Sequence, residues 1–103
     1  MLVEVLGGAD QRPEVRVVDV DDLTRLVLAL AEVTDEEADE ALRAAGLGRL
    51  EDADTAVLDA AAVRAAAGER AAGEEWAGRW AELTRTASAD GSLRVPVQSA
   101  AGA

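Results

Sequence analysis

Alanine accounts for nearly half of the hydrophobic residues in this 103-residue chain, and this limits the core that the chain can build. The bulky hydrophobic residues are 12 leucines, 12 valines, two tryptophans and one methionine. Because an alanine side chain buries little area, the hydrophobic free energy per residue is below average. A chain of this length forms one domain with a single modest core. We therefore expect a tightly packed, marginally stable domain that a partner or self-association would help to stabilise.

Several residue types that enzymes and metal sites commonly use are missing from the sequence, namely cysteine, histidine, lysine and tyrosine. Without cysteine the chain has no disulfide and no thiolate nucleophile or metal ligand. Without histidine it lacks the usual general base near neutral pH and the commonest metal ligand. The bias toward alanine, arginine, glycine, valine and acidic residues is typical of a GC-rich bacterial genome. We expect a protein that is not an enzyme and that binds no cofactor and no metal ion.

The N-terminal segment MLVEVLGGAD has no basic region and no long apolar stretch, so it is unlike a signal peptide. The longest apolar run, LVLALA at 26–31, is too short to cross a bilayer. We expect a cytoplasmic protein that does not associate with membranes.

The first part of the chain predicts a hairpin followed by a helix. Segments 2–6 and 15–20 are rich in valine and leucine and predict two strands. The linker between them, GGADQRPE, contains two glycines and a proline, so we expect a turn and antiparallel pairing. The apolar residues from Leu23 to Leu30 recur at i, i+3, i+4 and i+7, which predicts a helix over 23–30.

A second helix is indicated directly after this one. Thr34 followed by Glu37 fits a capping box, in which each side chain bonds the other residue's backbone amide. Gly46 lies where a helix commonly ends in a left-handed residue. Asp39 and Arg43 form a favourable i, i+4 pair on this helix.

The second half of the chain predicts further helices and a last strand. Segment 47–55 is a polar connection, and 56–59 is either a short strand or the start of a helix. Gly68 and Gly73 interrupt the helical pattern, which predicts helices near 60–67 and 74–87. Segment 93–97 alternates like a strand, and we expect it at a sheet edge because Pro96 cannot donate a hydrogen bond.

Together these elements predict an α+β fold: a small, mainly antiparallel sheet, made of the N-terminal hairpin and a C-terminal edge strand, covered by three or four helices. The globular domain spans 1–97, and 98–103 is a C-terminal tail. Trp76 and Trp80 share one helical face with Leu83, so we expect them to fill the core, although two exposed tryptophans would be natural anchors for a protein partner.

Negative charge is concentrated in the first part of the chain. Residues 1–59 hold 16 carboxylates and five arginines, a net charge of −11, whereas residues 60–103 hold five of each. Six of the nine residues from Glu32 to Glu40 are carboxylates. The helix dipole favours the acidic residues of the first turn, 35–37, but it explains Asp39 and Glu40 less well. Glu36 and Glu40 also form a like-charge i, i+4 pair, which disfavours the helix slightly. The cluster is therefore either a solvated helix face or a surface that attracts a basic partner.

The second explanation defines the candidate partner-binding residues: Glu32, Asp35, Glu36, Asp39 and Glu40. The sequence then favours a small acidic interaction module, of the immunity or antitoxin type or a nucleic-acid mimic, that binds a basic protein surface. The alternative is a structural or accessory subunit that assembles through apolar contacts of the tryptophan helix or an edge strand. Direct binding of nucleic acid is not expected, because the ten arginines are scattered among carboxylates.

Two acidic segments, DVDD at 19–22 and EDAD at 51–54, are the best candidates for a weak divalent-cation site. The twelve residues from Asp52 lack the glycine and the final glutamate of an EF-hand loop. Capping by Asp21 or Asp54 explains these segments better than a metal does.

Overall fold

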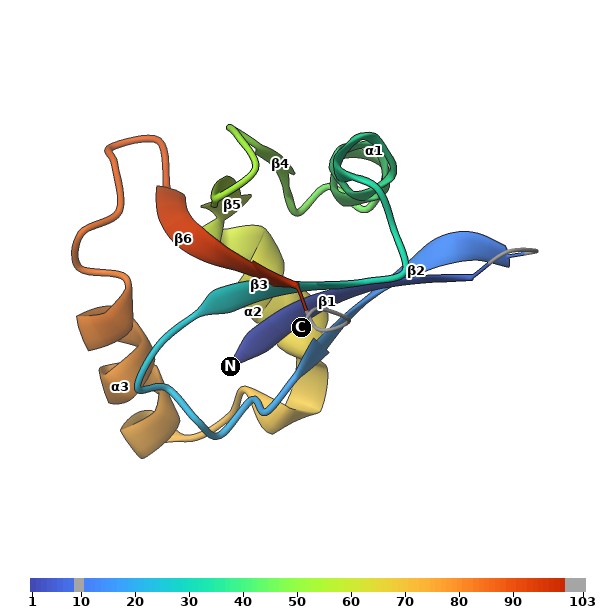
Figure 1. Cartoon of the computed structure of the whole chain (residues 1–103). Coiled ribbons are helices and arrows are strands. Elements are labelled where there is room, and N and C mark those ends of the chain that lie inside the picture. The colour runs from blue at the N-terminus through green and yellow to red at the C-terminus, as the bar shows by residue number, and fades with distance from the viewer. Residues whose placement is uncertain (9–10, 100–103) are drawn as a thin grey trace.

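The computed structural model describes residues 1–8 and 11–99, which form a small α+β domain (Figure 1). Its elements follow the order β1 (Leu2–Gly8), β2 (Gln11–Val18), β3 (Val27–Ala31), α1 (Asp35–Ala44), β4 (Gly48–Leu50), β5 (Thr55–Asp59), α2 (Ala60–Ala67), the 3-10 turn η1 (Gly68–Arg70), α3 (Glu74–Leu83) and β6 (Ser92–Ser99). Within this described part of the chain, no helix is long and apolar enough to cross a membrane.

The strands form one curled, mixed sheet of six strands in the order β2-β1-β3-β6-β5-β4 (Figure 1). β1 and β2 form the predicted antiparallel hairpin. The centre is parallel, since β3 pairs in parallel with both β1 and β6. β5 then pairs in antiparallel fashion with β6 and β4. The prediction of a small, mainly antiparallel sheet was therefore wrong, although the protein is of the α+β class.

The central strand β3 lies where the sequence pattern predicted a helix over 23–30, and this prediction was wrong. Leu28 and Leu30 face the main core, while Val27 and Ala29 are buried on the opposite face of the sheet. A continuous apolar run is typical of a strand that is covered on both faces. Such a run also places apolar residues at helical spacing, so the spacing alone does not indicate a helix. Pairing with a strand on each side then determines the conformation.

The last strand, β6, was predicted to lie at a sheet edge. This prediction was wrong, because β6 lies between β3 and β5. Its pairing with β5 ends at Pro96, and its pairing with β3 begins at Val97. The N–H of Val97 donates to the Asp54 carbonyl on the β5 side. The nitrogen of the preceding residue, Pro96, therefore faces the β3 side, at a position where β6 does not yet pair with β3. The missing N–H therefore interrupts neither ladder. β6 also includes Gln98 and Ser99 of the predicted tail, whose residues 100–103 lie outside the described residues.

The helices follow the predicted boundaries with one exception. α1 begins with the predicted capping box, in which Thr34 Oγ1 accepts from the Glu37 N–H at 3.1 Å and Glu37 Oε1 accepts from the Thr34 N–H at 2.9 Å. α2 covers the predicted range, and the α-helix ends before Gly68, as the glycines indicated. α3 ends at Leu83, four residues before the predicted end at 87.

The core lies inside the curl of the sheet and includes both tryptophans, as predicted. Trp76 and Trp80 are 7% and 6% exposed, and their rings stack with centroids 5.3 Å apart. Trp76 Nε1 donates to the Val20 carbonyl at 2.9 Å, which satisfies the indole nitrogen in its buried position. The two rings supply the large apolar volume that the alanines cannot.

Candidate functional site

Helix α1 carries most of the predicted site and packs against β2 and β4 (Figure 1). Its apolar face buries Ala38 and Leu42 completely. Packing of these two side chains turns the opposite face, which bears the acidic residues, toward solvent. The amphipathic pattern of the sequence thus explains why the carboxylates of α1 gather on one surface.

Four of the five predicted residues have exposed side chains: Glu32, Asp35, Glu36 and Glu40. Glu32 lies in the turn between β3 and α1 with a φ of 56°, a conformation that side-chain-bearing residues adopt infrequently. Asp35 and Glu36 occupy the first turn of α1. No arginine whose side chain the structure describes forms an ion pair with any of these four carboxylates. All four carboxylates lie on the solvent-exposed surface.

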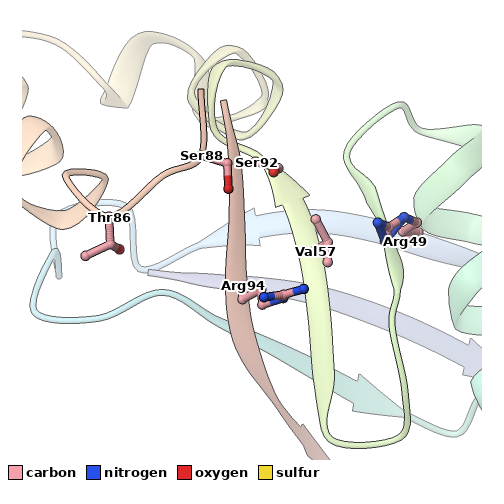
Figure 2. A pocket seen from close by; sticks show the side chains of 6 residues that line it. All are labelled: Arg49, Val57, Thr86, Ser88, Ser92 and Arg94. Carbon is pink, nitrogen blue, oxygen red and sulfur yellow. The ribbon is translucent and has the colours of Figure 1, made fainter. Parts of the chain in front are cut away.

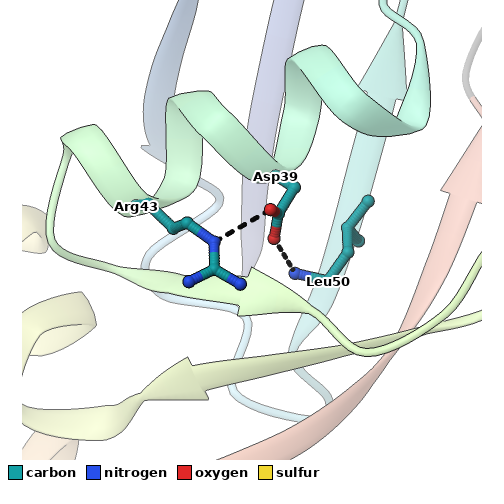
Figure 3. Close-up of polar contacts among 3 residues, drawn as sticks. All are labelled: Asp39, Arg43 and Leu50. Carbon is teal, nitrogen blue, oxygen red and sulfur yellow. Dashed lines mark hydrogen bonds and ion pairs between the residues drawn. The ribbon is translucent and has the colours of Figure 1, made fainter.

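The fifth predicted residue, Asp39, has internal partners instead. One carboxylate oxygen accepts from the backbone N–H of Leu50 in β4, and the other accepts from Arg43 Nε, each at 2.8 Å (Figure 3). These bonds, that of Leu50 first, lower the pKa of the Asp39 carboxyl below its ordinary value. Asp39 thus fastens α1 to β4 and is less available to a partner than its neighbours.

A groove lies between α1 and the edge strand β2. It has a volume of about 470 Å³ and is lined by Pro13, Glu37, Glu40, Ala41 and Ala44. We call it the α1 groove. Alanine and proline make its apolar surface, and two glutamates add carboxylates to it. The side chain of Glu37 also bonds the Thr34 N–H in the capping box.

Sequence reasoning found Glu40 but missed the rest of the α1 groove. Pro13 belonged to a segment read as a turn, and Glu37 was assigned only to the capping box. The groove arises because β2 begins at Gln11, which carries Pro13 into the sheet edge beside α1. A prediction of the hairpin register, with β2 extended backward from residue 15, would have been the signal needed.

The carboxylates of the two acidic segments make local contacts. Within residues 1–8 and 11–99, no three acidic side chains converge in a way that would hold a metal ion. In the acidic segments, Asp22 accepts from the Thr24 N–H and hydroxyl, and Asp52 accepts from the Asp54 N–H, so both close local turns.

Comparison of the chain with protein-family models, with curated proteins and with solved structures gives no match.

Proposed function

We propose that this protein is a small non-enzymatic interaction module that binds a basic segment of another protein. The proposed binding surface, called the α1 surface, consists of the α1 groove and the exposed side chains of Asp35 and Glu36. The α1 groove carries this proposal. Its lining combines proline and alanine side chains with the carboxylates of Glu37 and Glu40. The exposed carboxylates of Asp35 and Glu36 belong to the same helix. An arginine- or lysine-bearing segment with a few apolar side chains would satisfy both parts of this surface.

The distribution of negative charge also supports a basic partner. The chain carries a net charge of −11, all of it within residues 1–59. A concentrated negative field speeds the encounter with a cationic surface and weakens as the salt concentration rises. Binding of this kind suits an inhibitor that covers the basic active site of a toxin or nuclease, or a mimic that occupies a nucleic-acid-binding surface.

Assembly through the tryptophan helix has less support. Trp76 and Trp80 are buried in the core of the single chain, so they offer no exposed aromatic anchor to a partner subunit. A structural role would have to use the edge strands β2 or β4.

The test compares three immobilised proteins in the lysate of the organism that makes this chain. These are the wild type, the variant Asp35→Asn/Glu36→Gln/Glu40→Gln, and the control Glu69→Gln/Glu74→Gln/Glu82→Gln. The control removes the same charge from exposed positions of η1 and α3. We expect the wild type and the control to retain a basic protein that a salt gradient releases, and the α1 variant to lose it.

Equal retention of the same proteins by the α1 variant would contradict the proposal. A partner that all three proteins hold through high salt would indicate an apolar interface and favour the structural role. Circular dichroism of each variant checks that the fold is intact before the comparison is made.

A further inference from the structure

The outer face of β4, β5 and β6 carries two arginines in one cross-strand row. Arg49 of β4 and Arg94 of β6 both lie opposite Val57 of β5, so all three side chains are on the same face of the sheet. The next row, which contains Leu58 and Leu93, is buried in the core. Because successive residues of a strand point to opposite faces, the arginine row points away from the core.

This row borders a hollow of about 330 Å³ (Figure 2). Its lining is polar and consists of Arg49, Val57, Thr86, Ser88, Ser92 and Arg94. We call it the Arg49–Arg94 groove. Figure 2 shows the Arg94 side chain extending from β6 toward β5, with Ser88 and Ser92 at the upper end of the groove. No carboxylate is among the residues that line it, in a chain with 21 acidic residues.

Two nearby carboxylates are bonded to residues that line the groove. Glu51 pairs with Arg94 at 2.8 Å, and the Arg94 side chain remains 74% exposed. Asp90 accepts from the N–H and the hydroxyl of Ser92, and these bonds lower the pKa of its carboxyl. No ion pair joins Arg49 to a carboxylate whose side chain the structure describes. An adjoining hollow shares Arg49, Val57 and Ser92 with this groove and is also lined by Arg43, Asp59 and Asp90.

Strand spacing brings the two guanidinium groups within reach of one ligand. Neighbouring strands are about 4.8 Å apart, which places the backbones of Arg49 and Arg94 roughly 10 Å from each other across β5. Two arginine side chains span this interval and can approach one group above Val57 from both sides. The planar guanidinium matches the two oxygens of a carboxylate or phosphate group, and it stays charged at every physiological pH.

We propose that the Arg49–Arg94 groove binds the oxyanion group of a small molecule, a phosphate or a carboxylate, between these two arginines. Glu51 occupies Arg94 when the groove is empty, and an exposed ion pair of this kind is weak enough for a ligand to displace. The groove lies on different elements from the α1 groove, so this proposal stands independently of the acidic surface. Its ligand is an anion, whereas the α1 surface is expected to bind a cation.

Titration of the ¹⁵N-labelled protein with inorganic phosphate, and separately with malonate, tests the proposal at constant ionic strength. We expect saturable shifts of the amide signals of Arg49, Val57 and Arg94. Saturation by phosphate alone assigns a phosphate group, saturation by malonate alone assigns a carboxylate, and saturation by both assigns the shared oxyanion chemistry.

Variants identify the residues responsible. Arg49→Ala and Arg94→Gln should each weaken binding tenfold or more, an effect of about 1.4 kcal/mol or larger. Glu51→Gln should tighten it several-fold by freeing Arg94. The control Arg79→Ala removes an exposed, ion-paired arginine from α3 and should bind like the wild type. The proposal is overturned if neither anion gives saturable shifts, or if all the variants bind as the wild type does.

Discussion

Asp39 in α1 and Leu50 in β4 are joined by a 2.8 Å hydrogen bond from a backbone N–H to a carboxylate oxygen. Leu50 is the last residue of β4, and β4 is the outermost strand on its side of the sheet. The bond therefore ties an edge strand to the helix beside it. It also explains why Asp39 differs in its role from the other four predicted residues, Glu32, Asp35, Glu36 and Glu40.

Replacing Asp39 with alanine should lower the free energy of unfolding by about 1–3 kcal/mol, because the part-buried N–H of Leu50 loses its acceptor. Urea unfolding measures this loss. The matched control is Glu40→Gln on the same helix, which removes the like-charge pair with Glu36 and should raise stability by about 0.2–0.5 kcal/mol. A loss of the same size in both variants would mean that the Leu50 contact has no special effect.

The contribution of Asp39 should depend on pH. Its folded-state pKa is lower than its ordinary value, so the stability that it adds is fully present above the unfolded pKa of about 3.9 and is lost as the pH falls through the folded pKa. We expect the stability difference between the wild type and Asp39→Ala to be constant near neutral pH and to shrink in acid. Urea unfolding of both proteins across this range measures it, and a difference that persists unchanged in strong acid would contradict the assignment.

Trp76→Phe should destabilise the protein by about 1–3 kcal/mol, since the Val20 carbonyl loses its indole donor and the smaller ring leaves a gap. Thermal unfolding gives the size of the loss. The wild-type fluorescence should have its maximum at short wavelength, because both indoles are shielded from water. A long-wavelength maximum in the folded protein would show that the tryptophans are not in the core.

Gly48→Ala should be strongly destabilising, by about 2 kcal/mol or more. A Cβ at this position would lie 2.1 Å from the Val57 carbonyl oxygen, and its φ of 153° disfavours a side chain. Gly78→Ala is the control, because a Cβ there meets nothing within 4 Å and α3 should gain up to about 1 kcal/mol. Denaturant unfolding of both variants measures the contrast, and equal effects would contradict the close approach of β4 and β5.

Local signals predicted the local parts of this fold. The capping box at Thr34 and Glu37, the glycine break after α2 and the strand pattern of the N-terminal hairpin each depend on residues close in sequence. The position of β3 depends instead on strands from both ends of the chain, which pair with it on either side. A window of neighbouring residues cannot distinguish a central strand from one turn of a buried helix.

The candidate sites also divide into residues that the local sequence predicts and contacts that depend on strand pairing. Exposure of Asp35 and Glu36 follows from their places in an amphipathic helix, so the sequence was sufficient for them. The bond from Leu50 to Asp39 requires β4, which the sequence pattern treated as a polar connection. The row of Arg49 and Arg94 requires the register of three strands, and no spacing along the chain encodes it.

The double pairing of β6 has a consequence for the order in which the protein can form during synthesis. Leu28 pairs with Val97, and Ala56 pairs with Val95, so one late segment joins the N-terminal strands to the β4–β5 hairpin. Until residues 92–99 leave the ribosome, β3 and β5 both present unpaired edges and the two parts of the sheet stay separate. Contacts over such separations slow folding and prolong the exposure of these edges. We therefore expect the chain to be more prone to aggregation before β6 pairs with β3 and β5 than afterwards.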